Sequence, residues 1–205
     1  MKISYAITVC NELKEIQRLI PFLLENKCDG DEIVVLYDIK NGNINVEEYL
    51  KSIVSKGEFI WYSGMFEGHF ADWKNLLSDY CTGDYIFQID ADEIPNITLL
   101  ENLPLILEQN PDNEVYLVPR VNTVEGLTQE HIQKWRWNVK GWVNWPDYQW
   151  RIWKNKPEIQ WKNKVHEVLE GFKTYAPLHD TELLALYHPK DIKRQEKQNN
   201  FYDTL

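Results

Sequence analysis

The sequence predicts an α/β fold with a mostly parallel central sheet and helices on both faces. Through about the first 120 residues, apolar segments of strand length alternate with segments whose apolar residues recur at helical spacing. Turn-forming residues separate the two kinds of segment. The 205 residues, of which 43% are hydrophobic, are enough to bury a core and fit one domain over residues 1–205.

The first strand and the first helix follow directly from the chain start. Ile3–Val9 is apolar and β-branched, which predicts a strand. Asn11 then offers an N-cap for a helix over Leu13–Leu24, where apolar residues recur at helical spacing. Pro21 interrupts this run and is expected to kink the helix.

The next elements continue the alternation. Asp31–Asp38 is predicted as a short buried strand that ends in a carboxylate. Asn41-Gly42-Asn43 forms a turn, which leads to a helix over Val46–Val54 and a strand over Phe59–Tyr62. The first three strands are therefore separated by two helices, as a parallel sheet requires.

Two more helix and strand pairs complete the alternating part. The expected helices are Phe70–Tyr80 and Ile97–Gln109, and the expected strands are Tyr85–Asp90 and Glu114–Pro119. After about residue 120 the alternation stops, and we expect short strands.

Charge is distributed unevenly along the chain. The net charge is -10, yet residues 1–130 hold 9 basic and 23 acidic residues, whereas residues 131–205 hold 13 basic and 9 acidic ones. Residues 134–164 contain eight basic residues and seven of the nine tryptophans. This segment predicts an anionic or ring-shaped ligand, and the alternative is a hydrophobic wall with solvated lysines.

Membrane and disulfide classes are disfavoured. No window approaches about 18 consecutive apolar residues, and the start lacks the apolar run of a signal peptide. The three cysteines include no C-x-x-C pair, which disfavours a disulfide framework or a cysteine zinc site. We therefore expect a chain without a transmembrane segment in the reducing cytoplasm.

Acidic and polar residues follow the predicted strands at the edge where parallel sheets bind ligands. Thr8 to Glu12 follows the first strand, Asp38 ends the second, and Asp90-Ala91-Asp92-Glu93 follows the fourth. Two aspartates at i and i+2 can bind a divalent cation and a ribose or water. The structural alternative is a polar turn in which Asp92 or Glu93 caps the next helix.

Several other motifs are absent or incomplete. Ile94-Pro95-Asn96 follows the acidic motif and excludes an EF-hand loop. His166-Glu167 lacks the second histidine of an H-E-x-x-H zinc motif. The glycine-rich nucleotide-binding motifs G-x-x-x-x-G-K and G-x-G-x-x-G do not occur in the sequence. Pro146-Asp147 resembles a nuclease core but lacks the Glu-x-Lys partner downstream.

Six segments in order carry a resemblance to a known family: Asp31-Glu32-Ile33-Val34-Val35; Lys74-Asn75 before Thr82-Gly83-Asp84-Tyr85; Asp90-Ala91-Asp92-Glu93; Pro119-Arg120-Val121-Asn122; Pro146-Asp147-Tyr148-Gln149-Trp150-Arg151; and Val165-His166-Glu167. Together they resemble family 2 glycosyltransferases with a GT-A fold. Within that family the chain is most similar to lipopolysaccharide-core glucosyltransferases and bacteriocin-peptide glycosyltransferases, from about residue 3 to about residue 190.

The resemblance implies a nucleotide-sugar site in residues 1–120 and a Trp-rich acceptor side in residues 121–205. The implied cofactor is Mn²⁺ or Mg²⁺, with Asp92 as the direct ligand and His166 completing the site, and His188 is the rival ligand. The donor that the resemblance implies is a UDP-sugar. The implied contacts with this nucleotide-sugar are Thr8, Asn11, Glu12, Asp38, Lys74, Asn75, Asp90 and Ala91.

The residue chemistry suits an inverting transfer. Charge develops on a diphosphate leaving group, which a metal and a fixed cation, Arg151 or Lys74, would stabilise. A carboxylate must take the acceptor proton, and Asp147 is the first candidate and Glu167 the second. Ile39-Lys40-Asn41-Gly42-Asn43 replaces the family's Ser/Thr-Asp-Gly after the second strand, so the nucleotide contacts differ there.

Two other classes compete with a transferase. One is a non-catalytic module that binds a glycan or nucleic acid through tryptophans and lysines. The other is a sugar nucleotidyltransferase, which would need a Gly-rich loop where this chain has Val9-Cys10-Asn11-Glu12. The acceptor stays open among a glycan, a lipid-linked sugar, a peptide and a modified DNA base. The richness in Asn, Lys, Ile and Tyr favours an AT-rich genome, such as that of a low-GC bacterium or its phage. A homodimer is also left open, because relatives of this family often continue into helices that form dimers.

Overall fold

The computed structural model describes residues 1–53, 59–125 and 137–191. Its first half alternates strands and helices in the order β1 (Ile3–Val9), α1 (Leu13–Asn26), β2 (Glu32–Asp38), α2 (Ile44–Ile53), β3 (Phe59–Gly64), α3 (Phe70–Asp79), β4 (Tyr85–Asp90), β5 (Ile94–Pro95) and α4 (Ile97–Gln109). Its second half holds β6 (Val115–Val118), β7 (Arg120–Glu125), β8 (Gln149–Lys154), β9 (Gln160–Lys162), β10 (Val168–Glu170), β11 (Tyr175–Pro177), the 3₁₀ turn η1 (Glu182–Leu184) and β12 (Leu186–Asp191).

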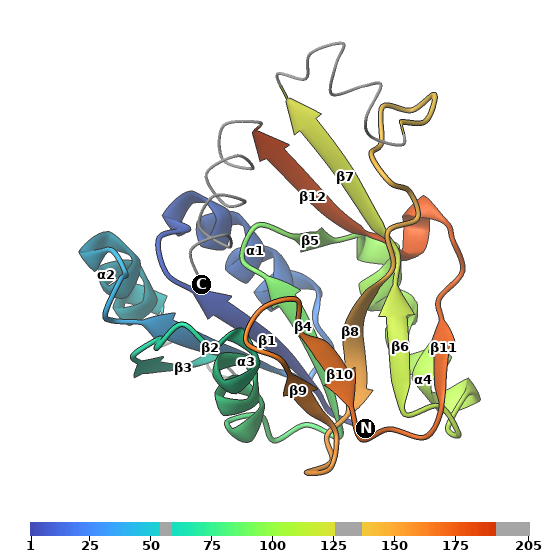
Figure 1. Ribbon diagram of the computed structural model, residues 1–205, viewed down its shortest axis with the longest axis horizontal. Helices are drawn as coiled ribbons and strands as arrows, with labels where there is room; N and C mark the ends of the chain where they lie inside the picture. Colours follow the sequence, from blue (N-terminus) through green and yellow to red (C-terminus); the bar gives the residue numbers. More distant parts are fainter. Residues whose placement is uncertain (54–58, 126–136, 192–205) are drawn as a thin grey trace.

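The central sheet has seven strands in the order β11-β6-β8-β4-β1-β2-β3 (Figure 1). The strands β3, β2, β1 and β4 run parallel, and β11 runs parallel to β6. Only β8 is antiparallel to both its neighbours in this sheet. The predicted α/β fold with a mostly parallel sheet is therefore confirmed, and β8 joins the alternating half to the later strands.

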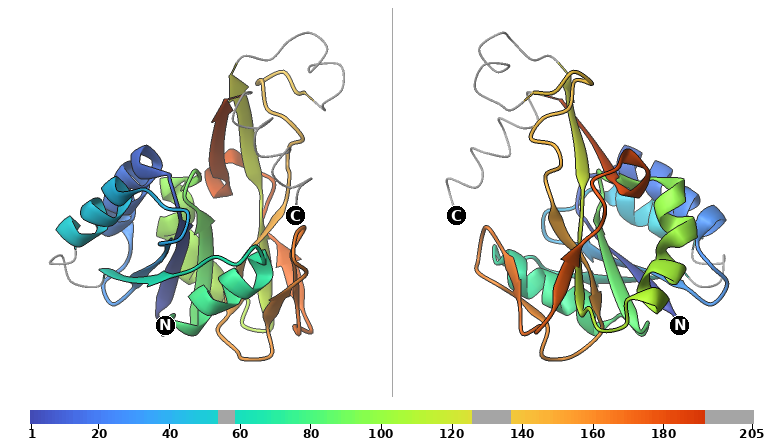
Figure 2. Two further views of the ribbon diagram at one scale, coloured as in Figure 1. Left: turned by 60° about the vertical axis from the view of Figure 1, so that its left-hand side comes forward. Right: turned by 90° about the vertical axis from the view of Figure 1, so that its right-hand side faces the viewer.

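Helices cover both faces of this sheet, as the sequence predicts. One buried cluster joins alternate residues of the strands to apolar residues of α1, α2 and α4, such as Ile16, Leu50 and Leu103. The other face of the sheet packs on α3 and the β9–β10 hairpin, through Trp73 and Trp161. The two views of Figure 2 show these two layers on opposite sides of the strands.

The element bounds agree closely with the predicted ones, with one correction. Asn11 does not cap α1: Glu12 occupies the N-cap position without a side-chain cap bond. The Asn11 amide instead donates to the carbonyl of Asn41 at 3.2 Å. It therefore ties the β1 end to the loop after β2. Helix α1 runs through Pro21 to Asn26, and the predicted end of α2 at Val54 lies outside the described residues.

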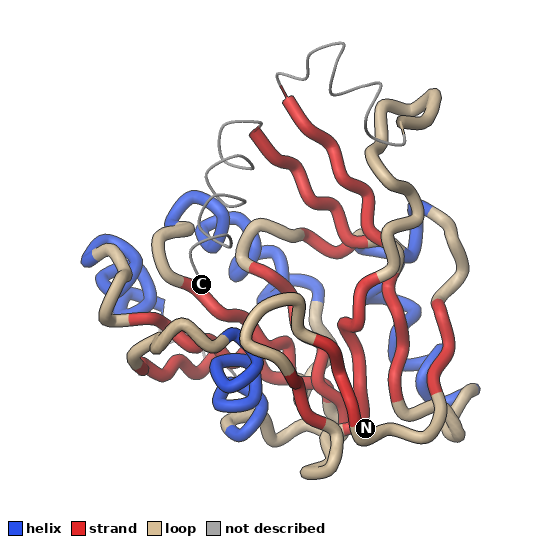
Figure 3. Tube along the Cα trace, in the orientation of Figure 1, coloured by secondary structure: helices blue, strands red, loops and turns tan. Residues whose placement is uncertain are grey.

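A second, three-stranded sheet in the order β5-β12-β7 extends away from the first (Figure 3). Strand β12 is parallel to β7, and their register places His188 opposite Asn122. In the main sheet, Thr8 is in register with Asp90 and Asp38 with Gly64. The carboxyl ends of the parallel strands thus meet at one edge.

The tryptophans divide between core and surface, which corrects part of the expected aromatic wall. Trp153 and Trp161 are buried with their rings 5.7 Å apart, in the core beneath α3. Burial prevents these two from stacking on a ligand. Trp145 and Trp150 are partly exposed and Trp137 is exposed, whereas Lys134, Trp135 and Arg136 lie outside the described residues.

None of the helices in the described parts of the chain combines the length and the apolar character needed to cross a bilayer. The cytoplasmic location and the homodimer stay predictions.

Candidate active site

A buried ion cluster stands where β4 ends. Arg151 lies on β8, the antiparallel neighbour of β4, and its Nη2 donates to Asp90 Oδ2 and, at 2.7 Å, to Glu93 Oε1. Glu93 is fully buried, and its Oε2 accepts from the backbone N–H of Asp90 at 3.1 Å. Burial disfavours the charge of Arg151, but the two carboxylates outweigh burial and raise its pKa. The guanidinium is therefore a permanent positive charge held between two carboxylates.

A second arginine connects this cluster to Asp147. Arg120 Nη1 donates to Glu93 Oε1 at 3.0 Å, while Nε and Nη2 donate to Asp147 Oδ2 at 2.9 and 2.8 Å. Gln149 Nε2 donates to the other oxygen, Asp147 Oδ1, at 3.0 Å. Asp147 has a φ of 30°, a backbone region that Asp tolerates better than most residues. Its carboxylate is thus fixed in place from both sides.

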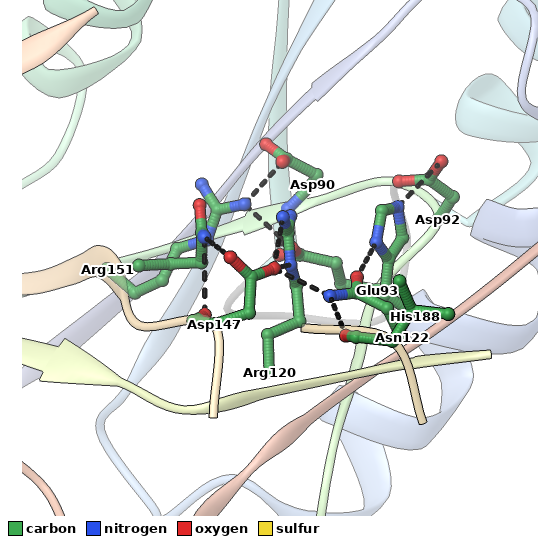
Figure 4. A network of polar contacts seen from close by, with 10 residues as sticks. Asp90, Asp92, Glu93, Arg120, Asn122, Asp147, Arg151 and His188 are labelled. Atoms are coloured by element: carbon green, nitrogen blue, oxygen red, sulfur yellow. Dashed lines mark hydrogen bonds and ion pairs between the residues drawn. The ribbon is translucent and has the colours of Figure 1, made fainter. Parts of the chain in front are cut away.

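Asn122 links Asp147 to a histidine and an aspartate. Its Nδ2 donates to Asp147 Oδ2 at 2.6 Å, and its Oδ1 lies 2.8 Å from His188 Nδ1. Because Asn122 Oδ1 can only accept, His188 Nδ1 carries the proton of this hydrogen bond. His188 Nε2 lies 3.5 Å from Asp92 Oδ2. Figure 4 shows the chain of contacts from Asp90 to Asp92.

Electrostatics keep the first aspartate of the D-x-D motif ionised. Burial opposes ionisation of Asp90, but the charges of Arg151, Lys74 and Arg120 outweigh it and hold the pKa of Asp90 below its ordinary value. Burial likewise opposes the charge of Arg120, but Glu93 and Asp147 raise its pKa. Asp90 and the two arginines therefore stay charged across the physiological pH range.

At the ends of β1 and β2, two residues that are predicted to contact the nucleotide make hydrogen bonds within the loops. Glu12 Oε2 accepts from the backbone N–H groups of Cys10 and Asn11 at 2.8 and 2.9 Å. Asp38 is buried, and its Oδ1 accepts from the N–H groups of Lys40 and Phe66 at 3.0 and 3.2 Å. These bonds fix the two loops at the carboxyl edge. The nucleotide contacts of these residues and of their neighbour Thr8 stay predictions.

Helix α3 carries the predicted Lys-Asn pair. Lys74 Nζ lies 2.8 Å from Glu167 Oε1 and 4.3 Å above the centre of the Trp161 ring. Asn75 exchanges two hydrogen bonds with the backbone of Trp161, at 2.8 and 3.0 Å. Asn75 thus holds β9 against α3, and Lys74 pairs with the second candidate base.

The structure separates the two candidate metal histidines. His188 is buried beside Asp92, whereas His166 is exposed in the loop between β9 and β10 with a φ of 54°. Within residues 1–53, 59–125 and 137–191, no three His, Cys, Asp or Glu side chains gather closely enough to hold a metal. One carboxylate and one imidazole still fit a divalent cation that takes its other ligands from a diphosphate or water.

Sequence reasoning gave no catalytic role to three residues that join this site. Glu93 was expected at most to cap a helix, but Asn96 caps α4 and Glu93 instead accepts from both arginines. Arg120 and Asn122 belong to a segment that carried the family resemblance. Arg120 and Asn122 lie one and three residues after Pro119, where the predicted apolar strand ends. Polar residues at a strand end were the signal in the sequence that could have placed them in the site.

The α/β sheet with its acidic edge has the architecture of a GT-A glycosyltransferase. The sequence matches the family described as "Glycosyl transferase family 2" over residues 4–176. The chain therefore belongs to glycosyltransferase family 2, which confirms the resemblance and favours a transferase over a binding module or a nucleotidyltransferase. The likeness to the lipopolysaccharide-core and bacteriocin-peptide enzymes stays a prediction.

Solved structures of TarS from S. aureus have a similar fold. TarS 1–349 aligns with a TM-score of 0.64 and 14% identity, covering 92% of this chain and 60% of that one. The same protein in complex with UDP aligns with a TM-score of 0.66, and in complex with UDP-GlcNAc with 0.59, each at 14% identity and 60% of that chain, covering 92% and 90% of this one. The chain thus spans about 60% of the length of TarS 1–349.

Proposed function

We propose that the protein is an inverting, metal-dependent glycosyltransferase that moves a sugar from a UDP-sugar to an acceptor hydroxyl. One observation carries this proposal: a single chain of contacts joins the D-x-D motif, His188 and Asp147 at the carboxyl edge of the parallel strands. The UDP and UDP-GlcNAc complexes of TarS support the choice of a UDP-sugar as donor.

Asp92 and His188 would hold Mn²⁺ or Mg²⁺ in this proposal. The hydrogen bond from His188 Nδ1 to Asn122 leaves Nε2 facing Asp92, so Nε2 is the nitrogen that a metal ion would take. A bound cation would supply stabilisation of the negative charge on the diphosphate leaving group.

Asp147 would act as the general base. Among the described residues, Oδ2 accepts three hydrogen bonds, from Arg120 and Asn122, and Oδ1 accepts one from Gln149. Because Oδ1 accepts only this one hydrogen bond among the described residues, it has room for the acceptor hydroxyl. Asp147 takes the hydroxyl proton, the oxygen attacks the anomeric carbon from the opposite face, and the bond to the diphosphate breaks.

The cation for the leaving group is better assigned to Lys74 than to Arg151. Arg151 is 3% exposed and its charge is matched by Asp90 and Glu93. Lys74 pairs with one partly exposed carboxylate, Glu167, and its charge already acts on Asp90. A diphosphate that arrives near Asp90 can take the place of Glu167 as the partner of Lys74.

A panel of UDP-sugars with Mn²⁺ tests this function. We expect slow release of UDP from at least one sugar, and UDP binding in calorimetry that weakens strongly when Mn²⁺ is removed by a chelator. Equal UDP affinity with and without metal would contradict the metal dependence. UDP, GDP and CDP are titrated in parallel. If the protein bound none of the three nucleotides, the assignment as a transferase would be contradicted.

A further inference from the structure

A pocket of about 440 Å³ opens between the segment after residue 137 and the η1 turn. Its lining combines two indole rings with charged and hydroxyl side chains: Trp142, Trp145, Lys140, Asp180, Thr181 and Glu182. This volume falls within the usual range for small-molecule sites, roughly 300–1,000 Å³. Within the described parts of the chain, the polar contacts given above for Asp90 and Asp92 involve none of these six lining residues.

The indole rings offer one covered and one open surface. Trp142 and Trp145 lie with ring centres 4.8 Å apart at 56°, so each fixes the other. Trp142 is buried, and Lys140 Nζ covers its ring at 4.4 Å. Trp145 is only partly buried and belongs to the lining of the pocket. An indole face of this kind suits the apolar C–H face of a sugar ring.

The charges in the pocket favour a neutral ligand. Lys140 Nζ lies 3.1 Å from Glu182 Oε2, so this cation is already matched by a carboxylate. Asp180 adds a second carboxylate to the lining, which makes the pocket slightly negative. Phosphate groups of nucleic acid or of a phosphodiester polymer would be repelled there. Carboxylate and Thr181 oxygens instead accept hydrogen bonds from hydroxyl groups.

The pocket belongs to the same turn as the candidate base. Trp145 lies two residues before Asp147, and the backbone N–H of Asp147 donates to the carbonyl of Asn144 at 2.9 Å. A ligand that rests on Trp145 would therefore be held by the turn that positions the Asp147 carboxylate.

We propose that this pocket is an acceptor subsite that binds one neutral sugar ring of the acceptor against Trp145. Its role as an acceptor subsite rests on the proposed glycosyl transfer, but its affinity for a neutral sugar does not. The acceptor class that follows is an uncharged glycan, rather than DNA or a phosphate-rich polymer.

Saturation-transfer NMR on the full chain without donor tests the pocket, with methyl glycosides of neutral hexoses and N-acetylhexosamines as probes and hexose 6-phosphates as charged counterparts. We expect millimolar binding of at least one neutral glycoside and no binding of its phosphorylated counterpart. Trp145→Ala should weaken this binding about tenfold, whereas Trp145→Phe should keep most of it. Trp137→Ala, an exposed tryptophan outside the lining, is the matched control and should bind normally.

The outcomes separate the pocket from the transfer. Glycoside binding that Trp145→Ala leaves unchanged, preference for the phosphorylated probes, or no binding by the wild type would each overturn the subsite. UDP release from UDP-sugars, measured without acceptor on the wild type and on Trp137→Ala, reports on the transfer alone and should be equal in these two proteins. Binding of glycosides with no UDP release from any donor would reject the transfer and keep the sugar pocket. A thermal melt confirms that each variant is folded.

Discussion

The two ends of the parallel strands both carry buried carboxylates, but they use them differently. At the amino ends, Glu32 accepts hydrogen bonds from Lys2, Ser4 and Thr82, at 2.6 to 2.8 Å. Asp31 beside it accepts from the backbone N–H of Ile3 at 2.8 Å. This cluster ties the starts of β1, β2 and β4 together, and every partner belongs to the fold itself.

At the carboxyl ends, the carboxylates form a chain of contacts that ends in the proposed base and the proposed metal ligands. Asp90 and Glu93 are matched by arginines, but the chain continues to Asp147 Oδ1 and to the facing pair of His188 and Asp92. The carboxylates at the amino ends hold the sheet together, whereas those at the carboxyl ends include the proposed base and the proposed metal ligand. The comparison predicts that substitutions at the carboxyl end change turnover and those at the amino end change stability.

The largest effect is expected for Asp92→Asn. Removing this charge removes the proposed anionic metal ligand, and several kcal/mol of leaving-group stabilisation correspond to about 10³-fold or more in kcat. The melting temperature should barely change, because Asp92 is partly exposed and the distance of 3.5 Å between its Oδ2 and His188 Nε2 is long for an ion pair. Steady-state UDP release and a thermal melt check both points. Normal turnover would show that the acidic motif has a structural role only.

Loss of the base comes next. Asp147→Asn should lower kcat by roughly 10²–10⁴-fold, the usual contribution of a general base. UDP affinity in the presence of Mn²⁺ should persist, because the proposed metal ligands are untouched. Glu167→Gln is the matched comparison. If Glu167→Gln loses turnover and Asp147→Asn keeps it, the base is Glu167; if both stay active, the base is another residue.

The sequence could predict the alternating half better than the site. Helix and strand positions through Gln109 follow from local apolar spacing, so Ile3–Val9 and Ile97–Gln109 agree with the structure to the residue. The pairing of β8 with both β4 and β6 joins residues about 30 to 70 positions apart, and local patterns carry no such information. That pairing is what brings Arg151 to Asp90.

The histidine assignment shows the same limit. His166 has the clearer motif, next to Glu167, but His188 is placed opposite Asn122 by the parallel pairing of β12 with β7. Asn75 shows the converse, because its position in the motif suggested a nucleotide contact while its amide bonds the backbone of Trp161. In both cases a tertiary contact decides where the side chain is placed.

The two histidines can be compared directly. His188→Gln should raise the Mn²⁺ concentration needed for half-maximal UDP binding by at least about tenfold, because the imidazole ligand is lost. His166→Gln should leave it within about twofold of the wild type, because His166 is exposed in the hairpin loop. Calorimetric titration of Mn²⁺ at fixed UDP gives both values. The reverse order would reinstate His166 as the ligand.

A smaller effect is expected for Asn122, which contacts both His188 and Asp147. Asn122→Ala removes the acceptor that orients His188 and one donor to the base, so Mn²⁺ affinity should fall about tenfold together with kcat. Asn122→Asp keeps the acceptor for His188 but loses the donor to Asp147. It should therefore retain Mn²⁺ affinity and lose kcat. Equal Mn²⁺ affinity in all three proteins would show that Asn122 does not position the histidine.

The amino-end cluster should show the opposite behaviour, with stability lost and turnover kept. Glu32→Gln replaces an acceptor of four hydrogen bonds by an amide that accepts at one end only, which should lower the free energy of unfolding by about 1–3 kcal/mol at pH 7.

Burial alone would raise the pKa of Glu32, but the bonds from Lys2, Ser4 and Thr82 lower it to about 2. Because this pKa lies below the ordinary value, the unfolded chain binds more protons between the two values, and the stabilisation is present above about pH 4.5 and is lost as the pH falls toward 2. Urea unfolding should therefore show a difference between wild type and Glu32→Gln that shrinks from about pH 5 to about pH 3. Glu48→Gln, which changes an exposed carboxyl on α2, should match the wild type at both pH values. A normal unfolding midpoint with reduced UDP release would contradict the division between the two strand ends.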